Sequence, residues 1–163
     1  MTEYSPVSPL RASHDRGQFD CGIEPLNDYL KKYALQNQKK GIVRKYVTCD
    51  DNRVIGYYSL AYGSVAQTDA PPALTKGIGK YPIPVMILAR LAVDLRKKGK
   101  GLGQALLKNA VMRTLQAAEI AGLKAIFVHA KNAEARQLYE KHGFIPSPHD
   151  PLQLFWPLAQ LHE

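Results

Sequence analysis

The sequence predicts an α/β protein, with a central mixed sheet flanked by helices. Segments of strand-forming residues alternate with segments of helical periodicity in the order β-α-β-β-β-α-β-α-β-β, which places helices on the faces of a sheet. Residues 85–93 form a near-continuous apolar run, typical of a strand buried on both faces. With 163 residues and no internal repeat, the chain is expected to form one domain spanning 1–163.

The amino-acid composition indicates which kinds of partner the protein could bind. Lysine and arginine number 22 against 14 acidic residues, a formal net charge of +8, which favours attraction to a polyanion such as nucleic acid, or to an acidic partner. Solubility alone is the alternative explanation. No stretch approaches the ~18 apolar residues of a membrane span, and the N-terminus lacks a signal-peptide pattern. We therefore expect a cytoplasmic protein with no membrane partner. Cys21 and Cys49 lack metal-ligand spacing, so no metal is expected.

The N-terminal part predicts an edge strand, a helix and a two-stranded meander. Prolines limit residues 3–12 to an edge strand at most. The helix should begin near Glu24, with Pro25 in its first turn, and end near Gly41. Its apolar residues recur at helical spacing and should form one buried stripe: Leu26, Tyr29, Leu30 and Tyr33. Two strands, Ile42–Thr48 and Val54–Val65, should be joined by a turn at residues 50–52.

The C-terminal part predicts the rest of the sheet and two further helices. Residues 66–82 form a long loop, which is expected to be functional or mobile. One helical face runs from Leu102 to Ala121, and a second helix, Ala133–Lys141, should be capped by Asn132 and ended by Gly143. The expected strands here are Val85–Val93, Lys124–Ala130, Phe144–Pro146 and Leu152–Trp156.

A basic, glycine-rich segment follows the central strand. The apolar run stops at Asp94, and Gly99, Gly101 and Gly103 precede a new helical pattern. The unpaired backbone N–H groups and positive dipole end of such a helix attract a phosphate-like anion. Glycines allow the anion to approach the backbone. Neither the P-loop pattern nor the dinucleotide fingerprint can be matched to this segment.

The segment resembles the diphosphate loop of the GNAT N-acetyltransferase superfamily, [QR]-x-x-G-x-[GA], which holds acetyl-CoA. Residues 96–101 match it literally, whereas residues 98–103 lie at the family's usual distance from the strand but begin with Lys98. We favour the second register because a cation serves the same electrostatic purpose. Residues 132–144 resemble a second signature of the family, N-x-x-A-x-x-[LF]-Y-x-x-x-G-F. The order of elements also matches GNAT topology over nearly the whole chain.

The resemblance implies acetyl-CoA as co-substrate and assigns roles to residues. Tyr139 would be the general acid that protonates the thiolate of CoA, since a phenol of pKa near 10 can donate a proton to a thiolate whose thiol has a pKa of ~8.5. A packing role is the alternative for Tyr139. Asn132 would contact the CoA arm. The other residues expected to bind acetyl-CoA are Leu91, Ala92, Val93, Lys98, Gly99, Lys100, Gly101, Leu102 and Gly103.

The acceptor is narrowed by the lack of acidic residues in the central strand. Lysine acetyltransferases commonly place a carboxylate there to deprotonate an amine of pKa ~10.4, but residues 85–93 contain no Asp or Glu. An α-amine, with a pKa near 8, needs less help. His129, at a strand end, could act as a base, although a structural histidine is the more common case. These observations favour an α-amino acceptor.

Four segments resemble the GNAT toxins of bacterial toxin–antitoxin pairs more closely: Phe19–Gly22, Gly56–Leu60, Ile83–Val85 and Leu88–Asp94. Those enzymes acetylate the α-amino group of aminoacyl-tRNA and so block translation. The resemblance further implies a ribbon-helix-helix antitoxin, operator DNA bound through the antitoxin complex, and a homodimer. The alternatives are a GNAT enzyme for a small amine or a protein N-terminus, and a non-catalytic nucleic-acid-binding or co-repressor module.

Seven cations are candidates for contact with tRNA. Arg90 is the only charge within the central strand, and a buried guanidinium there would require a carboxylate or a substrate phosphate. Contacts with phosphates would orient the RNA without reading its bases. The candidates are Arg90, Lys31, Lys32, Lys76, Lys80, Arg96 and Lys97.

Overall fold

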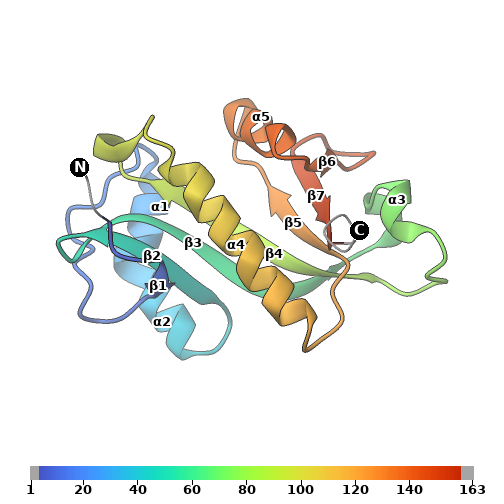
Figure 1. Ribbon diagram of the computed structural model, residues 1–163, viewed down its shortest axis with the longest axis horizontal. Helices are drawn as coiled ribbons and strands as arrows, with labels where there is room; N and C mark the ends of the chain where they lie inside the picture. The colour runs from blue at the N-terminus through green and yellow to red at the C-terminus, as the bar shows by residue number, and fades with distance from the viewer. Residues whose placement is uncertain (1–3, 159–163) are drawn as a thin grey trace. The chain divides into compact units, whose positions relative to one another are not determined.

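The computed structural model describes residues 4–158 (Figure 1). Within these residues, seven strands form one sheet in the order β1-β2-β3-β4-β5-β7-β6. The elements in chain order are β1 (Ser8–Pro9), α1 (Glu24–Asp28), η1 (Tyr29–Tyr33), α2 (Ala34–Lys39), β2 (Arg44–Asp50), β3 (Arg53–Val65), η2 (Gln67–Asp69), α3 (Pro72–Thr75), β4 (Ile83–Val93), η3 (Leu95–Lys97), α4 (Leu102–Ala118), β5 (Ala125–His129), α5 (Ala133–Lys141), β6 (Ile145–Pro146) and β7 (Gln153–Pro157). The predicted α/β class is confirmed, as is the order of the strands and of the three predicted helices. Residues 66–82, which were expected to be a loop, contain the short helices η2 and α3, so that expectation was wrong for this part of the segment.

Internal contacts divide the described chain into two compact units. The first unit contains residues 4–61 and 89–110, and the second contains residues 62–88 and 111–158. Strands β3 and β4 and helix α4 contribute residues to both units. Each unit has an apolar cluster of its own. The expectation of a single domain therefore stays a prediction.

The first unit contains an antiparallel meander that packs against the helical segment of α1, η1 and α2. β1 pairs with β2, and β2 pairs with β3. Asp51 and Asn52 form the two-residue loop between β2 and β3, with φ of +50° and +67°. Positive φ at both positions is the requirement of a type I′ hairpin turn. Leu30 and Ala34 belong to the same buried cluster as Val47 and Tyr57, so the helical segment covers this face of the meander.

The predicted helix exists, but its buried stripe differs at one residue. α1, η1 and α2 run from Glu24 to Lys39, and η1 is a π-helical segment. Tyr29 and Leu30 are buried as expected, whereas Tyr33 is exposed and Ala34 is buried in its place. The backbone N–H of Ala34 bonds to the carbonyl of Tyr29. This i→i+5 turn shifts the inward position from i+4 to i+5, so the prediction for Tyr33 was wrong.

The second unit surrounds the parallel part of the sheet. β4 pairs in parallel with β5, β5 pairs antiparallel with β7, and β7 pairs antiparallel with β6. The unit's apolar cluster includes Ile83, Val85 and Phe155. Gly143, with φ of +93°, follows α5 as predicted. Because α4 ends at Ala118, Ala121 lies outside it and is exposed, so its predicted place on the helical face was wrong.

Candidate functional site

The candidate anion site lies where β4 leads through a loop into α4. Gly99 and Gly101 have φ of +77° and +81°, a conformation that side-chain-bearing residues rarely adopt. A Cβ atom built on either glycine meets no heavy atom within 4 Å. The backbone of this loop is therefore unobstructed at both glycines. It precedes the first turn of a 17-residue helix, whose N-terminal N–H groups can bind an anion.

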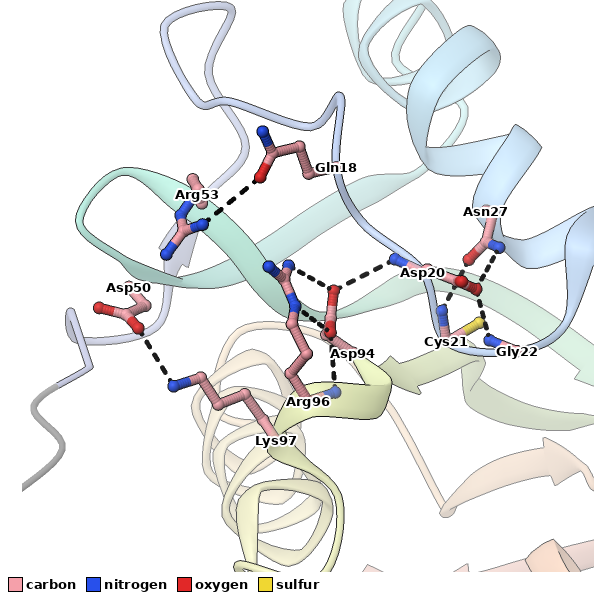
Figure 2. A network of polar contacts seen from close by, with 10 residues as sticks. All are labelled: Gln18, Asp20, Cys21, Gly22, Asn27, Asp50, Arg53, Asp94, Arg96 and Lys97. Atoms are coloured by element: carbon pink, nitrogen blue, oxygen red, sulfur yellow. Dashed lines mark hydrogen bonds and ion pairs between the residues drawn. The ribbon is translucent and has the colours of Figure 1, made fainter.

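Asp94 holds the start of this loop (Figure 2). Its buried carboxylate accepts hydrogen bonds from the backbone N–H of Arg96 (2.9 Å) and from the Arg96 side chain (2.9 and 3.1 Å). It also accepts one from the backbone N–H of Asp20 (3.2 Å). Burial alone would raise the pKa of Asp94, but the bonds from Arg96 and Asp20 outweigh it and leave the pKa below its ordinary value.

A second set of bonds ties the segment before α1 to the same place. Asp20 accepts hydrogen bonds from the backbone N–H of Gly22 (2.9 Å) and from the amide of Asn27 (3.0 Å). Both bonds lower the pKa of Asp20, and the bond from Gly22 has the larger effect. The backbone N–H of Leu95 donates to the Asp20 carbonyl at 2.8 Å. The sequence did not predict that Asp20, held by Asn27, would bond to the start of η3. The Asp-x-Gly pattern at residues 20–22 did indicate a local bond between the Asp20 side chain and the backbone.

The cations near the loop differ in whether they form an ion pair. Arg96 pairs with Asp94, and the amine of Lys97 lies 3.1 Å from the carboxylate of Asp50. Lys98 and Lys100 are exposed. Arg96 is thus held by Asp94, and the choice of the register that begins at Lys98 stays a prediction. The predicted contact of Arg96 and Lys97 with RNA stays a prediction.

Arg90 differs from the expected buried guanidinium. The residue is exposed, and its φ of +56° lies in the left-handed region. Its guanidinium carbon Cζ lies 3.9 Å from the centre of the Tyr29 ring. The expectation of a buried charge was wrong, because a left-handed residue breaks the alternation of a strand and lets the side chain leave the interior.

Lys45 is a buried cation that sequence reasoning missed. The residue is 0% exposed, and its amine lies 4.7 Å from the centre of the Tyr29 ring. Burial, and then the charge of Arg90, lower the pKa of Lys45 to about 7. Strand alternation with Val47 and Cys49 was the available signal, since residues two apart share one face of a strand.

In the second unit, α5 carries Tyr139 and begins at Asn132. Tyr139 is 8% exposed, and its ring centre lies 5.3 Å from that of Phe144. Burial raises the pKa of Tyr139 to about 12, so its hydroxyl stays protonated at neutral pH. The side-chain oxygen of Asn132 accepts a hydrogen bond from the backbone N–H of Ala135 at 2.8 Å. The predicted N-cap is confirmed, and the amide nitrogen of Asn132 takes no part in it.

The remaining predicted residues lie on both units. In β4, Leu91 and Val93 are half-buried and Ala92 is buried. Exposed Lys31 and Lys32 lie on η1, and the amine of Lys32 is 3.7 Å from Asp28. Lys76 and Lys80 belong to the 66–82 segment, where Lys80 lines a pocket of about 370 Å³. His129 is exposed at the end of β5, 4.0 Å from Asp150.

Two further features of the structure concern membrane-spanning helices and metal-binding clusters. Across residues 4–158, no helix combines the length and the apolar character needed to cross a membrane. In the same part of the chain, no three His, Cys, Asp or Glu side chains gather in a way that could hold a metal ion.

The part of the chain that contains these residues is similar to known proteins. Residues 42–146 match the family model of the acetyltransferase (GNAT) domain. A tRNA-acetylating toxin of Mycobacterium tuberculosis is 46% identical over 154 residues, which cover 94% of this chain and 92% of that protein.

Solved structures of the protein AtaT have the same fold. AtaT complexed with acetyl-methionyl-tRNAfMet matches with a TM-score of 0.91 and 29% identity, covering 98% of both chains. A mutant AtaT toxin bound to the C-terminus of the antitoxin AtaR and acetyl-CoA matches with a TM-score of 0.83 and 29% identity, covering 98% of this chain and 96% of that one. The AtaT–AtaR complex bound to DNA matches with a TM-score of 0.77 and 28% identity over 97% of both chains.

Proposed function

Since this chain belongs to the GNAT acetyltransferase family, we propose that it is a toxin that transfers the acetyl group of acetyl-CoA to the α-amino group of aminoacyl-tRNA. Acetylation of that amine removes the nucleophile that translation requires. The observation that carries the proposal is the 46% identity to a tRNA-acetylating toxin over 94% of the chain.

The loop after β4 supports a role in holding acetyl-CoA. Its backbone is open at Gly99 and Gly101 and leads into the N-terminus of α4, which suits a diphosphate. We assign the contacts to residues 98–103, with Lys98 as the cation. Backbone groups of Leu91, Ala92 and Val93 would bind the pantetheine arm and polarise the acetyl carbonyl.

Tyr139 and Asn132 supply the remaining roles at acetyl-CoA. Acetyl-CoA brings a thioester that an amine can attack directly. The hydroxyl of Tyr139 is held protonated by burial, which keeps it a hydrogen-bond donor for the departing sulfur over the whole physiological pH range. Asn132 caps α5 with its oxygen, and its amide nitrogen would contact the CoA arm.

The charge of the chain supports a nucleic-acid acceptor. The formal net charge of +8 attracts a polyanion. β4 supplies no Asp or Glu between residues 83 and 93, so the acceptor amine has to be partly neutral without a carboxylate from this strand. The α-amine of an aminoacyl ester meets that requirement, since its pKa lies near or below 8.

The likeness to AtaT supports the proposed partners. We propose that an antitoxin neutralises this chain, that it carries a ribbon-helix-helix domain, and that the complex binds operator DNA. A homodimer and a cytoplasmic location, where aminoacyl-tRNA is used, complete the proposal.

A comparison of acceptors tests the proposed function. The purified protein should acetylate total aminoacyl-tRNA much faster than the same amino acids in free form, and this preference should fall steeply with salt. Equal rates on both acceptors would favour the small-amine enzyme instead. Acetylation of a protein N-terminus but not of aminoacyl-tRNA would favour the other alternative.

A further inference from the structure

Two cations of the first unit converge on one tyrosine ring. The amine of Lys45 on β2 lies 4.7 Å from the ring centre of Tyr29 on η1. The guanidinium carbon of Arg90 on β4 lies 3.9 Å from the same centre. Together with Ser59, the residue opposite Lys45 on β3, these residues form what we call the two-cation cluster: Tyr29, Lys45, Ser59 and Arg90.

Two polar atoms of the cluster are buried without a partner. Because Lys45 and Ser59 are opposite residues on β2 and β3, their side chains share one face of the sheet. Both residues are 0% exposed. Neither the Lys45 amine nor the Ser59 hydroxyl has a hydrogen-bond partner within residues 4–158. Folded proteins leave few buried polar atoms unpaired because each costs free energy, so two at adjacent positions indicate a group that binds there.

The charges of the cluster define the sign of that group. Within residues 4–158, neither Lys45 nor Arg90 forms an ion pair with a carboxylate. The other titratable groups that face the cluster are Tyr29 and Tyr57, and burial raises the pKa of Tyr57. The phenol of Tyr57 is therefore uncharged at neutral pH. An anion would supply an acceptor for both unpaired atoms and a counter-charge for both cations.

We propose that the two-cation cluster binds one phosphodiester group of the acceptor RNA. Arg90 is exposed and would make the first contact with the phosphate, whereas Lys45 and Ser59 are buried. This inference rests on the proposed function, because it takes the acceptor to be RNA. It adds Tyr29, Lys45 and Ser59 to the residues that position the substrate.

Binding at this site is coupled to a proton on Lys45. In the free protein the pKa of Lys45 is about 7, lowered first by burial and then by Arg90. A phosphate raises this pKa because an opposite charge favours the ammonium form. Below pH 7 both states hold the proton, so the affinity for RNA is constant. Above pH 7 the affinity falls as the pH rises, by up to about tenfold per pH unit.

Binding of deacylated total tRNA, measured by fluorescence anisotropy over a salt series at pH 6.5 and 8.5, tests the site. We expect Lys45→Met and Arg90→Gln each to weaken binding about tenfold at pH 6.5. Each should reduce the slope of log K against log salt by about 0.7–0.9, the loss of one phosphate contact. Lys45→Met should also abolish most of the pH dependence. Lys108→Met, which removes an exposed cation of α4, should keep the wild-type slope.

Two controls separate the source of the phosphate from effects on folding. Acetyl-CoA affinity should stay within about twofold of wild type in both variants. If instead acetyl-CoA binding weakens while tRNA binding does not, the phosphate belongs to CoA and the inference is overturned. Lys45→Met should melt at or above the wild-type temperature, since it replaces a buried unpaired amine with an apolar group. If Lys45→Met fails to fold, the salt slope of Arg90→Gln and the RNA affinity of Ser59→Ala provide the test.

The inference and the proposed function can fail separately. Wild-type salt slopes in Lys45→Met and Arg90→Gln would overturn the inference while the wild-type protein still acetylates aminoacyl-tRNA. So would a wild-type slope in Arg90→Gln together with an unchanged RNA affinity in Ser59→Ala, which removes a hydrogen bond and no charge. A wild-type protein that does not acetylate aminoacyl-tRNA would remove the proposed function itself.

Discussion

The guanidinium of Arg90 lies over the ring of Tyr29, with Cζ 3.9 Å from the ring centre, while the backbone of Arg90 has a φ of +56°. This left-handed conformation costs a residue with a Cβ atom about 1–2 kcal/mol. An exposed cation–π contact returns about 0.5–1 kcal/mol. The contact therefore does not fully offset the strain, and strain of this kind is retained mainly where a side chain has a functional role.

Replacing Arg90 with glycine or alanine should reveal this strain. Glycine in a strand is ordinarily less stable than alanine by about 0.5–1 kcal/mol. At a φ of +56° the order should reverse, so we expect Arg90→Gly to be about 1 kcal/mol more stable than Arg90→Ala. Urea unfolding of the two variants measures the difference. An alanine variant as stable as the glycine variant would show that position 90 is not strained.

Removing the charge of Asp94 should destabilise the first unit. Asp94→Asn weakens three bonds from Arg96 and one from Asp20, and we expect a loss of about 1–3 kcal/mol in the free energy of unfolding. The matched control is Asp28→Asn, which breaks only the exposed pair with Lys32 and should cost less than about 0.5 kcal/mol. Equal losses in the two variants would contradict the importance of the Asp94 contacts.

The same carboxylate predicts an acid dependence of stability. The folded-state pKa of Asp94 is lower than its ordinary value, because the hydrogen bonds outweigh burial. Its contribution is therefore complete above the unfolded-state pKa of about 3.9 and is lost as the pH falls through the lower folded-state value. Urea midpoints measured between pH 6 and pH 3 should fall less steeply for Asp94→Asn than for wild type. Parallel curves would contradict the assignment.

Glycine replacements distinguish the diphosphate loop from an ordinary turn. Gly101 and Gly41 have φ of +81° and +76°, and a Cβ on either meets nothing within 4 Å. Alanine at each position should therefore cost a similar ~1 kcal/mol of stability. Only Gly101→Ala should weaken acetyl-CoA binding, by about tenfold or more, the equivalent of one charge-assisted hydrogen bond. Isothermal titration of both variants decides, and unchanged affinity in Gly101→Ala would remove this loop from the binding site.

Tyr139→Phe should separate binding from turnover. Phenylalanine keeps the ring that packs against Phe144, so the melting temperature and acetyl-CoA affinity should stay near wild type. The acetylation rate should fall by about 10²–10⁴, the usual contribution of a general acid. Tyr62→Phe, at an exposed tyrosine of the same unit, should keep the wild-type rate. Undiminished turnover in Tyr139→Phe would exclude its hydroxyl from the mechanism.

Local signals explain which parts of the fold could be predicted. The cap at Asn132 and the stop at Gly143 bound α5, and both act within one or two turns of chain. The Asp51–Asn52 turn is similarly local. Tyr33 could not be placed, since the π-helical turn at η1 depends on how the helix packs rather than on the periodicity of its residues.

The candidate site was predictable where it depends on backbone and not where it depends on side-chain neighbours. The open backbone of the loop after β4, at Gly99 and Gly101, agrees with what the spacing of the glycines predicts. The left-handed conformation of Arg90 has no signal within a run of strand-forming residues. The convergence of Lys45 and Arg90 on Tyr29 joins three segments far apart in the chain, and no sequence pattern specifies such a meeting.

Acetyl transfer to total aminoacyl-tRNA is the most direct test of the central claim. The protein is incubated with labelled acetyl-CoA and aminoacyl-tRNA, the RNA is recovered, and its ester bonds are cleaved with mild base for mass spectrometry. The proposed function predicts release of a labelled N-acetyl amino acid with wild-type protein and almost none with Tyr139→Phe. Label that stays on the RNA after base treatment, or that is found only on free amino acids or protein, would contradict it.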